Sequence, residues 1–287
     1  MKGIVLAGGT GSRLWPITKG VCKQLLPVHD KPLIHYPIGT LMLAGIRRIL
    51  IISTPEDLQS FQRLLGDGSN LGISFEYQIQ EKPDGIAQAF LIAEDFIGTE
   101  SVALALGDNI FHGVGLGTQL KSMGEVVGAH IFAYKVSNPE DYGVVEFDSN
   151  GKVTAITEKP KSPKSNWVVP GLYFYDASVV QYSKLLIPSK RGELEITSLN
   201  DLYLKKNLLR ISVLERGTAW LDTGTIENLH AASAYVRILE ERQGLKISCL
   251  EEIAWRNGWI SDEKIRSLGE SYGVNPYGRY LLSIVDS

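Results

Sequence analysis

The sequence predicts an α/β fold built on a mainly parallel, doubly wound sheet. Three short apolar runs have the composition of strands that are buried on both faces. Segments with helical periodicity separate the runs, and strands that alternate with helices are typical of parallel sheets. The length of 287 residues fits one large α/β domain or two small ones. The three runs are Lys2–Ala7, Arg48–Ser53 and Val102–Leu106.

Helices are expected between these strands. The first should cover Pro32–Ala44, because a proline suits the first helical turn and a glycine follows the last apolar residue. A second should start at Thr54, a capping residue with an acid three positions later. A third is expected over Gly85–Ile97. Between the last two, residues 73–79 alternate between apolar and polar side chains, as in a half-exposed strand.

The pattern changes at about residue 129. Four strand-like segments follow, and the turn sequence Asp148-Ser149-Asn150-Gly151 joins two of them, so this half should contain antiparallel pairing. A helix at 195–206, a strand at 208–215 and a long amphipathic helix at 225–242 come next, before short helices around 250–257, 262–268 and 277–285. The sequence has no low-complexity linker and no internal repeat. The four segments are Ala129–Val136, Gly143–Phe147, Val153–Glu158 and Gly171–Asp176.

Composition excludes several classes of partner. With 29 Lys+Arg against 32 Asp+Glu, the net charge is −3, which argues against nucleic acid or a strongly anionic membrane as partner. No apolar stretch approaches the length of a membrane span, and the N-terminal apolar run is too short for a signal peptide. Two distant cysteines, Cys22 and Cys249, form no metal motif and fit reduced thiols. We therefore expect a cytoplasmic protein.

The strongest chemical signal is the glycine-rich segment Gly8–Leu14, directly after the first strand. Glycines let the backbone approach a phosphate closely, and successive amides there can form an anion-binding concavity. Arg13 adds a planar, permanently charged donor suited to phosphate. The alternative is a plain glycine turn. The segment is neither a Walker A loop, since GxxxxGK[ST] does not occur, nor a dinucleotide fingerprint, since Leu14 stands at the third glycine position.

A second segment, Lys23–Val28, follows about ten residues later. The string GGTGSRL…KQLLPV resembles the two-part signature of the sugar-nucleotide pyrophosphorylases, which join a sugar 1-phosphate to a nucleoside triphosphate. Further segments along nearly the whole chain are similar to one branch, the bacterial glucose-1-phosphate thymidylyltransferases. These segments are Lys31–Ile34, Leu41–Ile46, Pro83–Phe90, Leu106–Asn109, Tyr142–Phe147, Glu158–Pro160, Gly171–Asp176, Arg191–Thr197, Trp220–Thr225, Glu241–Lys246 and Glu251–Ala254.

The resemblance implies a three-layer, Rossmann-like nucleotide-diphospho-sugar transferase fold with a mixed, mainly parallel central sheet. It implies a core over 1–225, with a nucleotide-binding part at about 1–128 and a sugar-binding part at about 129–225. Residues 226–287 would form a helical appendage packed on the core as part of the same domain.

Two aspartates are candidate metal ligands. Asp108 follows a buried strand, where open α/β sheets place their sites, and Asp222 stands at a second junction of strand and loop. Two carboxylates and phosphate oxygens make a hard oxygen set suited to Mg²⁺. Taken alone, either aspartate would more often be a turn or helix cap than a metal ligand. The resemblance assigns both as Mg²⁺ ligands.

The resemblance also assigns the substrate contacts. Arg13, Lys23, Asp108 and Lys159 would be catalytic. An amide such as that of Gln80 can pair with the edge that thymine and uracil share, whereas Glu158 and Lys159, taken alone, could form a surface ion pair. The sugar would contact Asn109, Tyr142, Gly143, Glu158, Lys159 and Val169. The nucleotide would contact Leu6, Gly8, Gly9, Thr10, Gly11, Ser12, Arg13, Lys23, Gln24, Gln80, Pro83, Asp84, Gly85 and Asp108.

The expected reaction is Mg²⁺-dependent transfer of a thymidylyl group from dTTP to α-D-glucose 1-phosphate, which gives dTDP-glucose and pyrophosphate. The sugar phosphate would attack the α-phosphorus directly and in line, as the first step toward dTDP-L-rhamnose and related deoxysugars. A UTP-preferring uridylyltransferase is one alternative, since the two bases differ by a methyl group. A non-catalytic nucleotide-sugar sensor is the other. Trp15, Glu81, Lys82 and Pro170 depart from the branch pattern and leave substrate preference open.

The family resemblance further implies a homotetramer. It also implies feedback inhibition by a dTDP-sugar that binds away from the active site.

Overall fold

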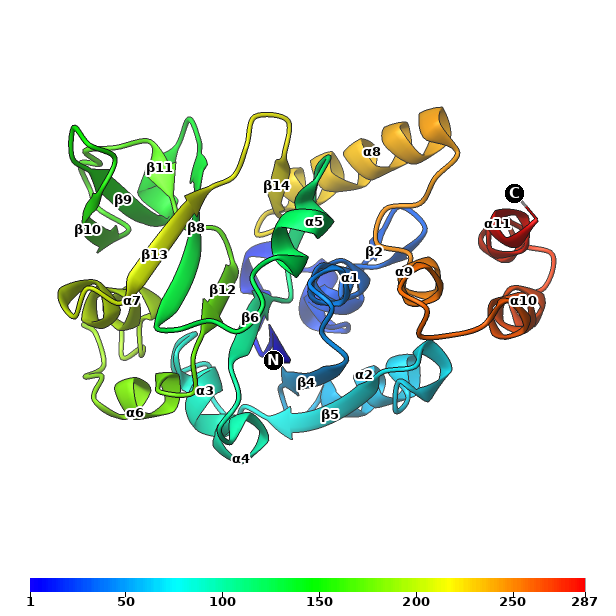
Figure 1. Ribbon diagram of the computed structural model, residues 1–287, viewed down its shortest axis with the longest axis horizontal. Coiled ribbons are helices and arrows are strands. Elements are labelled where there is room, and N and C mark those ends of the chain that lie inside the picture. Colours follow the sequence, from blue (N-terminus) through cyan, green and yellow to red (C-terminus); the bar gives the residue numbers. More distant parts are fainter. Residues whose placement is uncertain (287) are drawn as a thin grey trace.

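A ten-stranded mixed sheet runs through the protein, as the computed structural model of residues 1–286 shows (Figure 1). Its strands are β1 (Lys2–Ala7), β4 (Arg48–Ser53), β5 (Ser74–Ile79), β6 (Val102–Leu106), β8 (Ala129–Lys135), β9 (Gly143–Phe147), β10 (Val153–Glu158), β11 (Trp167–Val168), β12 (Leu172–Tyr175) and β13 (Leu209–Val213). Their order is β10-β9-β11-β8-β12-β6-β1-β4-β5, and β13 pairs with β8.

Strand direction confirms the expected mixed, mainly parallel sheet. Strands β6, β1, β4 and β5 are mutually parallel. Strands β12, β11 and β10 each pair antiparallel with their neighbours, whereas β13 is parallel to β8, so three strands of the sheet oppose the other seven. The carboxyl ends of β1 and β6 therefore meet at one edge, where loops can build a site.

Helices cover both faces of the sheet and make three layers. The helices are α1 (His35–Leu43), α2 (Leu58–Leu65), α3 (Gln88–Ile92), α4 (Glu94–Ile97), α5 (Leu116–Lys121), α6 (Val179–Lys184), α7 (Ile196–Lys205), α8 (Ile226–Gln243), α9 (Leu250–Arg256), α10 (Asp262–Ser271) and α11 (Pro276–Val285). Alternate side chains of β1 point to opposite faces. Val5 packs with residues of α1, α2 and α5, whereas Ile4 packs with residues of α3, α4, α6 and α7.

Two short ribbons lie outside the main sheet. Strand β2 (Pro27–Val28) pairs with β3 (Lys31–Pro32), and β7 (Asn109–His112) pairs antiparallel with β14 (Ala219–Asp222). Helix α8 packs against β2 and β14, and its Ala232 and Val236 share a buried cluster with Val28 and Ile110. Helices α10 and α11 close a separate small cluster at the far end of the molecule (Figure 1).

Several expected elements have different bounds in the structure. Helix α1 begins at His35 rather than Pro32, because the amides of Leu33 and Ile34 donate to carbonyls of the 24–26 segment. The Thr54 hydroxyl accepts from the Asp57 amide at 3.2 Å, as a capping residue would, but α2 begins only at Leu58, after a turn. The segment 85–97 forms two short helices. The ribbons β2–β3 and β7–β14 and the strand β11 were not predicted as pairings, since their partners are set by tertiary contact.

Among residues 1–286, no helix combines the length and the apolarity that a bilayer crossing requires. The division into a core at 1–225 and an appendage from 226 stays a prediction.

Candidate active site

The glycine-rich segment leaves the carboxyl end of β1 as a tight loop. Gly11 has φ of 62°, a left-handed conformation that glycine adopts without strain, and its carbonyl accepts hydrogen bonds from the Leu14 amide and the Thr18 hydroxyl. A one-turn 3₁₀ helix at Ser12–Leu14 follows and buries Leu14, which leaves Arg13 exposed. Gly9, Thr10 and Ser12 are exposed to solvent, and no atom beyond the chain neighbours lies within 4 Å of the position that a Cβ on Gly9 would take. The loop therefore presents backbone and one guanidinium outward.

Lys23 joins this loop to the end of β6. It lies in a 3₁₀ turn at Lys23–Leu25, and its side chain is buried, with 5 % exposed. Its Nζ lies 2.6 Å from Oδ2 of Asp108, which directly follows β6 and Gly107. The ion pair places a cation and a carboxylate together at the edge where the parallel strands end.

The ribbon of β7 and β14 brings the second aspartate to the same place. Asp222 in β14 is the register partner of Asn109 in β7, so it lies beside Asp108 although 114 residues separate them in sequence. The Thr223 amide and hydroxyl both donate to the Asp108 carbonyl, at 3.1 and 2.9 Å. Backbone pairing, rather than flexible loops, sets the spacing of the two carboxylates.

The electrostatics of Asp222 favour a bound cation. Burial and the neighbouring Asp108 raise the pKa of the Asp222 carboxyl above its usual value, although Lys23 and Arg13 oppose the shift. Within residues 1–286, no lysine or arginine nitrogen lies within 4.0 Å of its carboxylate oxygens. Two adjacent carboxylates with incomplete neutralisation offer the hard oxygen ligands that a divalent cation prefers. The residues present therefore fit a divalent metal ion.

Gly224 keeps this corner open. A Cβ built on it would lie 3.1 to 3.2 Å from both carboxylate oxygens of Asp222 and 3.2 Å from a guanidinium nitrogen of Arg13. These distances are tighter than ordinary packing, so a side chain at this position would push the acid and the arginine aside. The glycine thus allows Arg13, which comes from the first loop, to approach Asp222.

A cavity of about 240 Å³ opens beside the two aspartates. The six residues predicted to contact the sugar all line it, together with Arg13, Asp108 and Asp222. The structure thus brings nine predicted residues together around one cavity. Those nine are Arg13, Asp108, Asn109, Tyr142, Gly143, Glu158, Lys159, Val169 and Asp222.

Glu158 and Lys159 occupy one wall of this cavity. The Thr197 hydroxyl donates to the Glu158 carboxylate, and a Cβ on Gly143 would lie 3.1 Å from that hydroxyl. Lys159 has φ of 42° and donates its amide to the Tyr142 carbonyl at 3.0 Å. A left-handed lysine is uncommon, and such conformations are concentrated at functional sites. The backbone here orients an exposed lysine at the edge of the cavity.

The predicted base-binding residues lie outside the cavity lining, beside the glycine loop. A Cβ on Gly8 would lie 2.1 Å from Oε1 of Gln80, so the two loops touch. Gln80 donates to Gln88 at 2.6 Å, and Gln88 donates to Asp84 at 3.2 Å. Leu6, Gly8–Ser12, Lys23, Gln24, Gln80 and Pro83–Gly85 do not line the cavity, and Gln24 is buried with 4 % exposed.

Other lining residues were not singled out from the sequence. Trp220 and Thr197 lie in segments that resemble the family, so the motifs pointed to these positions although the side-chain chemistry alone did not. Tyr173 likewise lies in the family-like segment Gly171–Asp176, whereas Asn200, in the middle of α7, lies in no such segment. These additional lining residues are Ile86, Leu106, Asp141, Gly171, Tyr173, Ile196, Thr197, Asn200, Trp220, Thr225 and Asn228.

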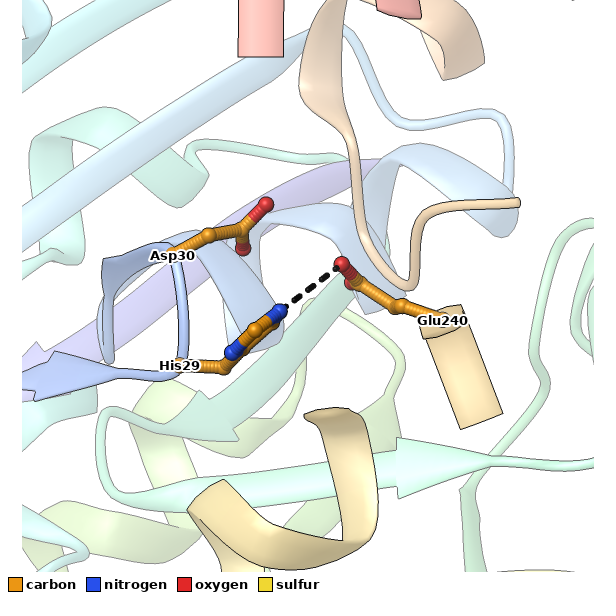
Figure 2. A group of neighbouring side chains, drawn as sticks. All are labelled: His29, Asp30 and Glu240. Carbon is orange, nitrogen blue, oxygen red and sulfur yellow. Dashed lines mark ion pairs between the residues drawn. The ribbon is translucent and has the colours of Figure 1, made fainter. Parts of the chain in front are cut away.

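A second group of metal-capable side chains lies away from the cavity. His29, Asp30 and Glu240 converge between the β2–β3 turn and α8 (Figure 2), with His29 Nε2 3.7 Å from a Glu240 oxygen. Lys31 lies 2.5 Å from Asp30 and 3.0 Å from Glu240, and Lys246 contacts both acids. Because two ammonium groups already neutralise the carboxylates, this group is an ion-pair cluster rather than a metal site.

Comparisons with known proteins identify the family of the chain. Residues 2–237 match the family described as Nucleotidyl transferase. Over 286 residues the chain is 57 % identical to a glucose-1-phosphate thymidylyltransferase of Neisseria meningitidis serogroup A, with 99 % of each chain covered. A protein of the same name from Mycobacterium tuberculosis strain H37Rv is 55 % identical, over 100 % of this chain and 99 % of the relative.

Solved structures give the same fold. A Bacillus anthracis protein assigned as a glucose-1-phosphate thymidylyltransferase, crystallised with a sucrose, has a TM-score of 0.76 at 43 % identity, covering 83 % of this chain and 95 % of that chain. A UDP-glucose pyrophosphorylase in complex with UDP-glucose has a TM-score of 0.69 at 26 % identity, covering 83 % of this chain and 98 % of that chain.

Proposed function

The chain belongs to the nucleotidyl transferase family and, within it, to the glucose-1-phosphate thymidylyltransferases, and on that premise we propose how its site works. The reaction joins dTTP and α-D-glucose 1-phosphate to give dTDP-glucose and pyrophosphate. The observation that carries the site assignment is that Arg13, Asp108 and Asp222 line one cavity with Glu158 and Lys159, while Lys23 pairs with Asp108.

Catalysis in this proposal is alignment and charge stabilisation, without a covalent enzyme intermediate. An oxygen of the sugar phosphate attacks the α-phosphorus of dTTP in line, a new P–O bond forms, and the bond to the β-phosphate oxygen breaks to release pyrophosphate. Lys159 positions the attacking phosphate. Arg13 and the amides of the glycine loop stabilise charge on the triphosphate, and Lys23 adds positive charge near the transferred group.

Asp108 and Asp222 are the proposed ligands of Mg²⁺. When bound, the ion would neutralise negative charge on the reacting phosphates. Lys23 lies on Asp108 in the structure, so this lysine would share or release that carboxylate when the ion and the nucleotide are present.

Base choice is assigned to the loop around Gln80 and Asp84. Its position against Gly8 puts it beside the segment proposed to hold the triphosphate. A uridylyltransferase remains the nearest alternative, because a single methyl group distinguishes the bases and contributes about 1–3 kcal/mol to discrimination. The glutamate and lysine at 81 and 82 are both exposed and put charge beside this loop.

One assay separates these alternatives. Pyrophosphate release is measured with glucose 1-phosphate and Mg²⁺ against dTTP, UTP, CTP, ATP and GTP in turn. The proposal predicts the highest kcat/KM with dTTP. A higher value with UTP would reassign the enzyme as a uridylyltransferase, and no release with any triphosphate would favour a non-catalytic nucleotide-sugar sensor.

Assembly as a homotetramer and feedback inhibition by a dTDP-sugar are also proposed, on the family resemblance, and a cytoplasmic location is proposed on the composition. A second cavity of about 620 Å³, which shares no lining residue with the first, is lined in part by Lys121, Lys246 and Arg256. Lys246 and Arg256 already pair with carboxylates there, so a bound diphosphate would have to compete with Asp30, Glu240 and Glu252. Light scattering tests the tetramer. Inhibition that added dTTP does not reverse would place the inhibitor outside the active site.

A further inference from the structure

Trp220 lies in β14, and its side chain has a single polar atom, the indole Nε1. Its indole is nearly buried, with 8 % exposed, and it lines the cavity. Nε1 of the indole donates a hydrogen bond to Oδ1 of Asn109 at 2.5 Å. Asn109 is itself buried, with 3 % exposed, so this bond is shielded from water.

The bond fixes which way the Asn109 amide points. Oδ1 also accepts from the Gly171 amide at 3.3 Å, so two N–H groups occupy the acceptor side of the amide. Flipping the amide would set its NH₂ group against both donors, which makes the flipped form unfavourable. The NH₂ group is therefore held toward Asp108, and Nδ2 donates to Oδ1 of that carboxylate at 2.7 Å.

Both oxygens of Asp108 thereby have assigned partners. Oδ1 accepts from Asn109 and Oδ2 lies 2.6 Å from Lys23, so the plane of the carboxylate is set from two sides. The same indole packs edge-on against Tyr142 at 5.0 Å between ring centroids, and the Tyr142 hydroxyl donates to Asp222 at 3.5 Å. Trp220 thus lies between the residues that contact each of the two aspartates.

We propose that Trp220 is a positioning residue, whose indole N–H orients Asp108 for the divalent cation through Asn109. The inference rests on the proposed function, because it concerns the same metal ligands. Partners that orient the ligands of a metal ion typically change metal affinity or activity by 10- to 100-fold when they are removed. An apolar ring that merely fills the cavity wall would not have this effect.

The substitution Trp220→Phe removes the N–H and keeps an aromatic ring. We expect the half-saturating Mg²⁺ concentration of pyrophosphate release to rise about tenfold, whereas KM for dTTP at saturating Mg²⁺ stays within twofold. Trp255→Phe is the matched control. It removes an indole N–H that donates to Asp262 at 2.7 Å, remote from the cavity, and should leave the Mg²⁺ titration unchanged.

A second readout does not depend on turnover. The affinity for Mn²⁺ is measured by electron paramagnetic resonance with dTTP present and sugar phosphate absent. Trp220→Phe should weaken Mn²⁺ binding about tenfold relative to the wild type. If the wild type binds Mn²⁺ with dTTP but releases no pyrophosphate with any substrate pair, the proposed function fails while this measurement still tests Trp220.

The route through Asn109 is tested by Asn109→Leu and the double variant. If Trp220 acts through Asn109, adding Trp220→Phe to Asn109→Leu should cause no further loss of Mn²⁺ affinity. Additive losses would overturn the route, and wild-type Mn²⁺ affinity in Trp220→Phe would overturn the proposal. If Trp220→Phe does not fold, Asn109→Leu alone must weaken Mn²⁺ binding, and unchanged binding there would overturn the proposal as well.

Discussion

Two clusters in this protein each combine two carboxylates with two cations, and they differ in how completely the acids are neutralised. The first cluster lies between the β2–β3 turn and α8, and Figure 2 shows its His29, Asp30 and Glu240. Lys31 and Lys246 each contact both Asp30 and Glu240, and the Ile247 amide donates to Glu240 at 2.8 Å. In the candidate active site, Lys23 pairs with Asp108, but no lysine or arginine within residues 1–286 pairs with Asp222.

The pKa shifts of the acids follow this difference. Burial alone would raise the pKa of Asp30, but Lys31 and Lys246 lower it below its usual value. The pKa of Asp222 is raised, by burial and by Asp108. A carboxylate that is fully paired with lysines links segments of the chain, whereas a carboxylate that is incompletely neutralised can bind a positively charged ligand. The comparison therefore separates a structural ion-pair cluster from the proposed metal site, although the two have similar compositions.

The largest expected effect is on catalysis by Asp222→Asn. The substitution removes one proposed metal ligand and keeps the size of the side chain, and a metal ion stabilises such transition states by several kcal/mol. We expect kcat/KM for pyrophosphate release to fall about 10³-fold. Asp108→Asn should lower kcat/KM by a similar factor. If both variants keep the Mg²⁺ titration curve of the wild type, the metal assignment is wrong.

Arg13→Ala should have the next largest effect. The guanidinium is exposed at the cavity mouth, so its loss should leave the fold intact while charge on the triphosphate loses a donor. We expect kcat/KM to fall about 10²-fold or more. Circular dichroism checks the fold, and near-normal turnover would remove Arg13 from the mechanism.

Glu240→Gln should act on stability instead. It leaves Lys31, which is 3 % exposed, and Lys246 without one of their two acids. Removing one partner of a buried ion pair costs about 3 kcal/mol of unfolding free energy, measured by urea denaturation. Glu241→Gln is the control, because that neighbour pairs with Arg237 on the surface and should change stability by less than about 1 kcal/mol. A smaller loss in Glu240→Gln than in its control would contradict the structural role.

The smallest effect is a difference of sign between the two clusters. An acid with a lowered folded pKa stabilises the fold above its unfolded pKa, and this contribution is lost as pH falls through the folded value. An acid with a raised folded pKa destabilises the fold when it is ionised, and this cost disappears as pH falls to its unfolded pKa. At pH 7, Asp30→Asn should therefore lower the unfolding free energy and Asp222→Asn should raise it. The Asp222 difference should disappear as pH falls to about 4, whereas the Asp30 difference should shrink only below about pH 4. Urea titrations at pH 7, 4 and 3 measure them, and shifts of equal sign at pH 7 would contradict the comparison.

Local motifs were readable from the sequence, whereas long-range pairings were not. The glycine loop with Arg13 and the apolar strands β1, β4 and β6 are encoded by neighbouring residues, and the structure places them as expected. The pairing of Asn109 with Asp222 joins distant segments of four residues each, too short for a periodicity signal. The role inferred for Trp220 could not be predicted either, because an indole in an apolar strand looks like packing until its hydrogen-bond partner is known.

The most direct test is a Mg²⁺ titration of pyrophosphate release from dTTP and glucose 1-phosphate. It compares the wild type, Asp222→Asn and Glu240→Gln at a temperature where all three are folded. The account predicts that the wild type releases pyrophosphate, that the normalised curve of Glu240→Gln superimposes on it, and that Asp222→Asn requires at least about tenfold more Mg²⁺. No release by the wild type, or a shifted curve for Glu240→Gln with an unshifted one for Asp222→Asn, would contradict it.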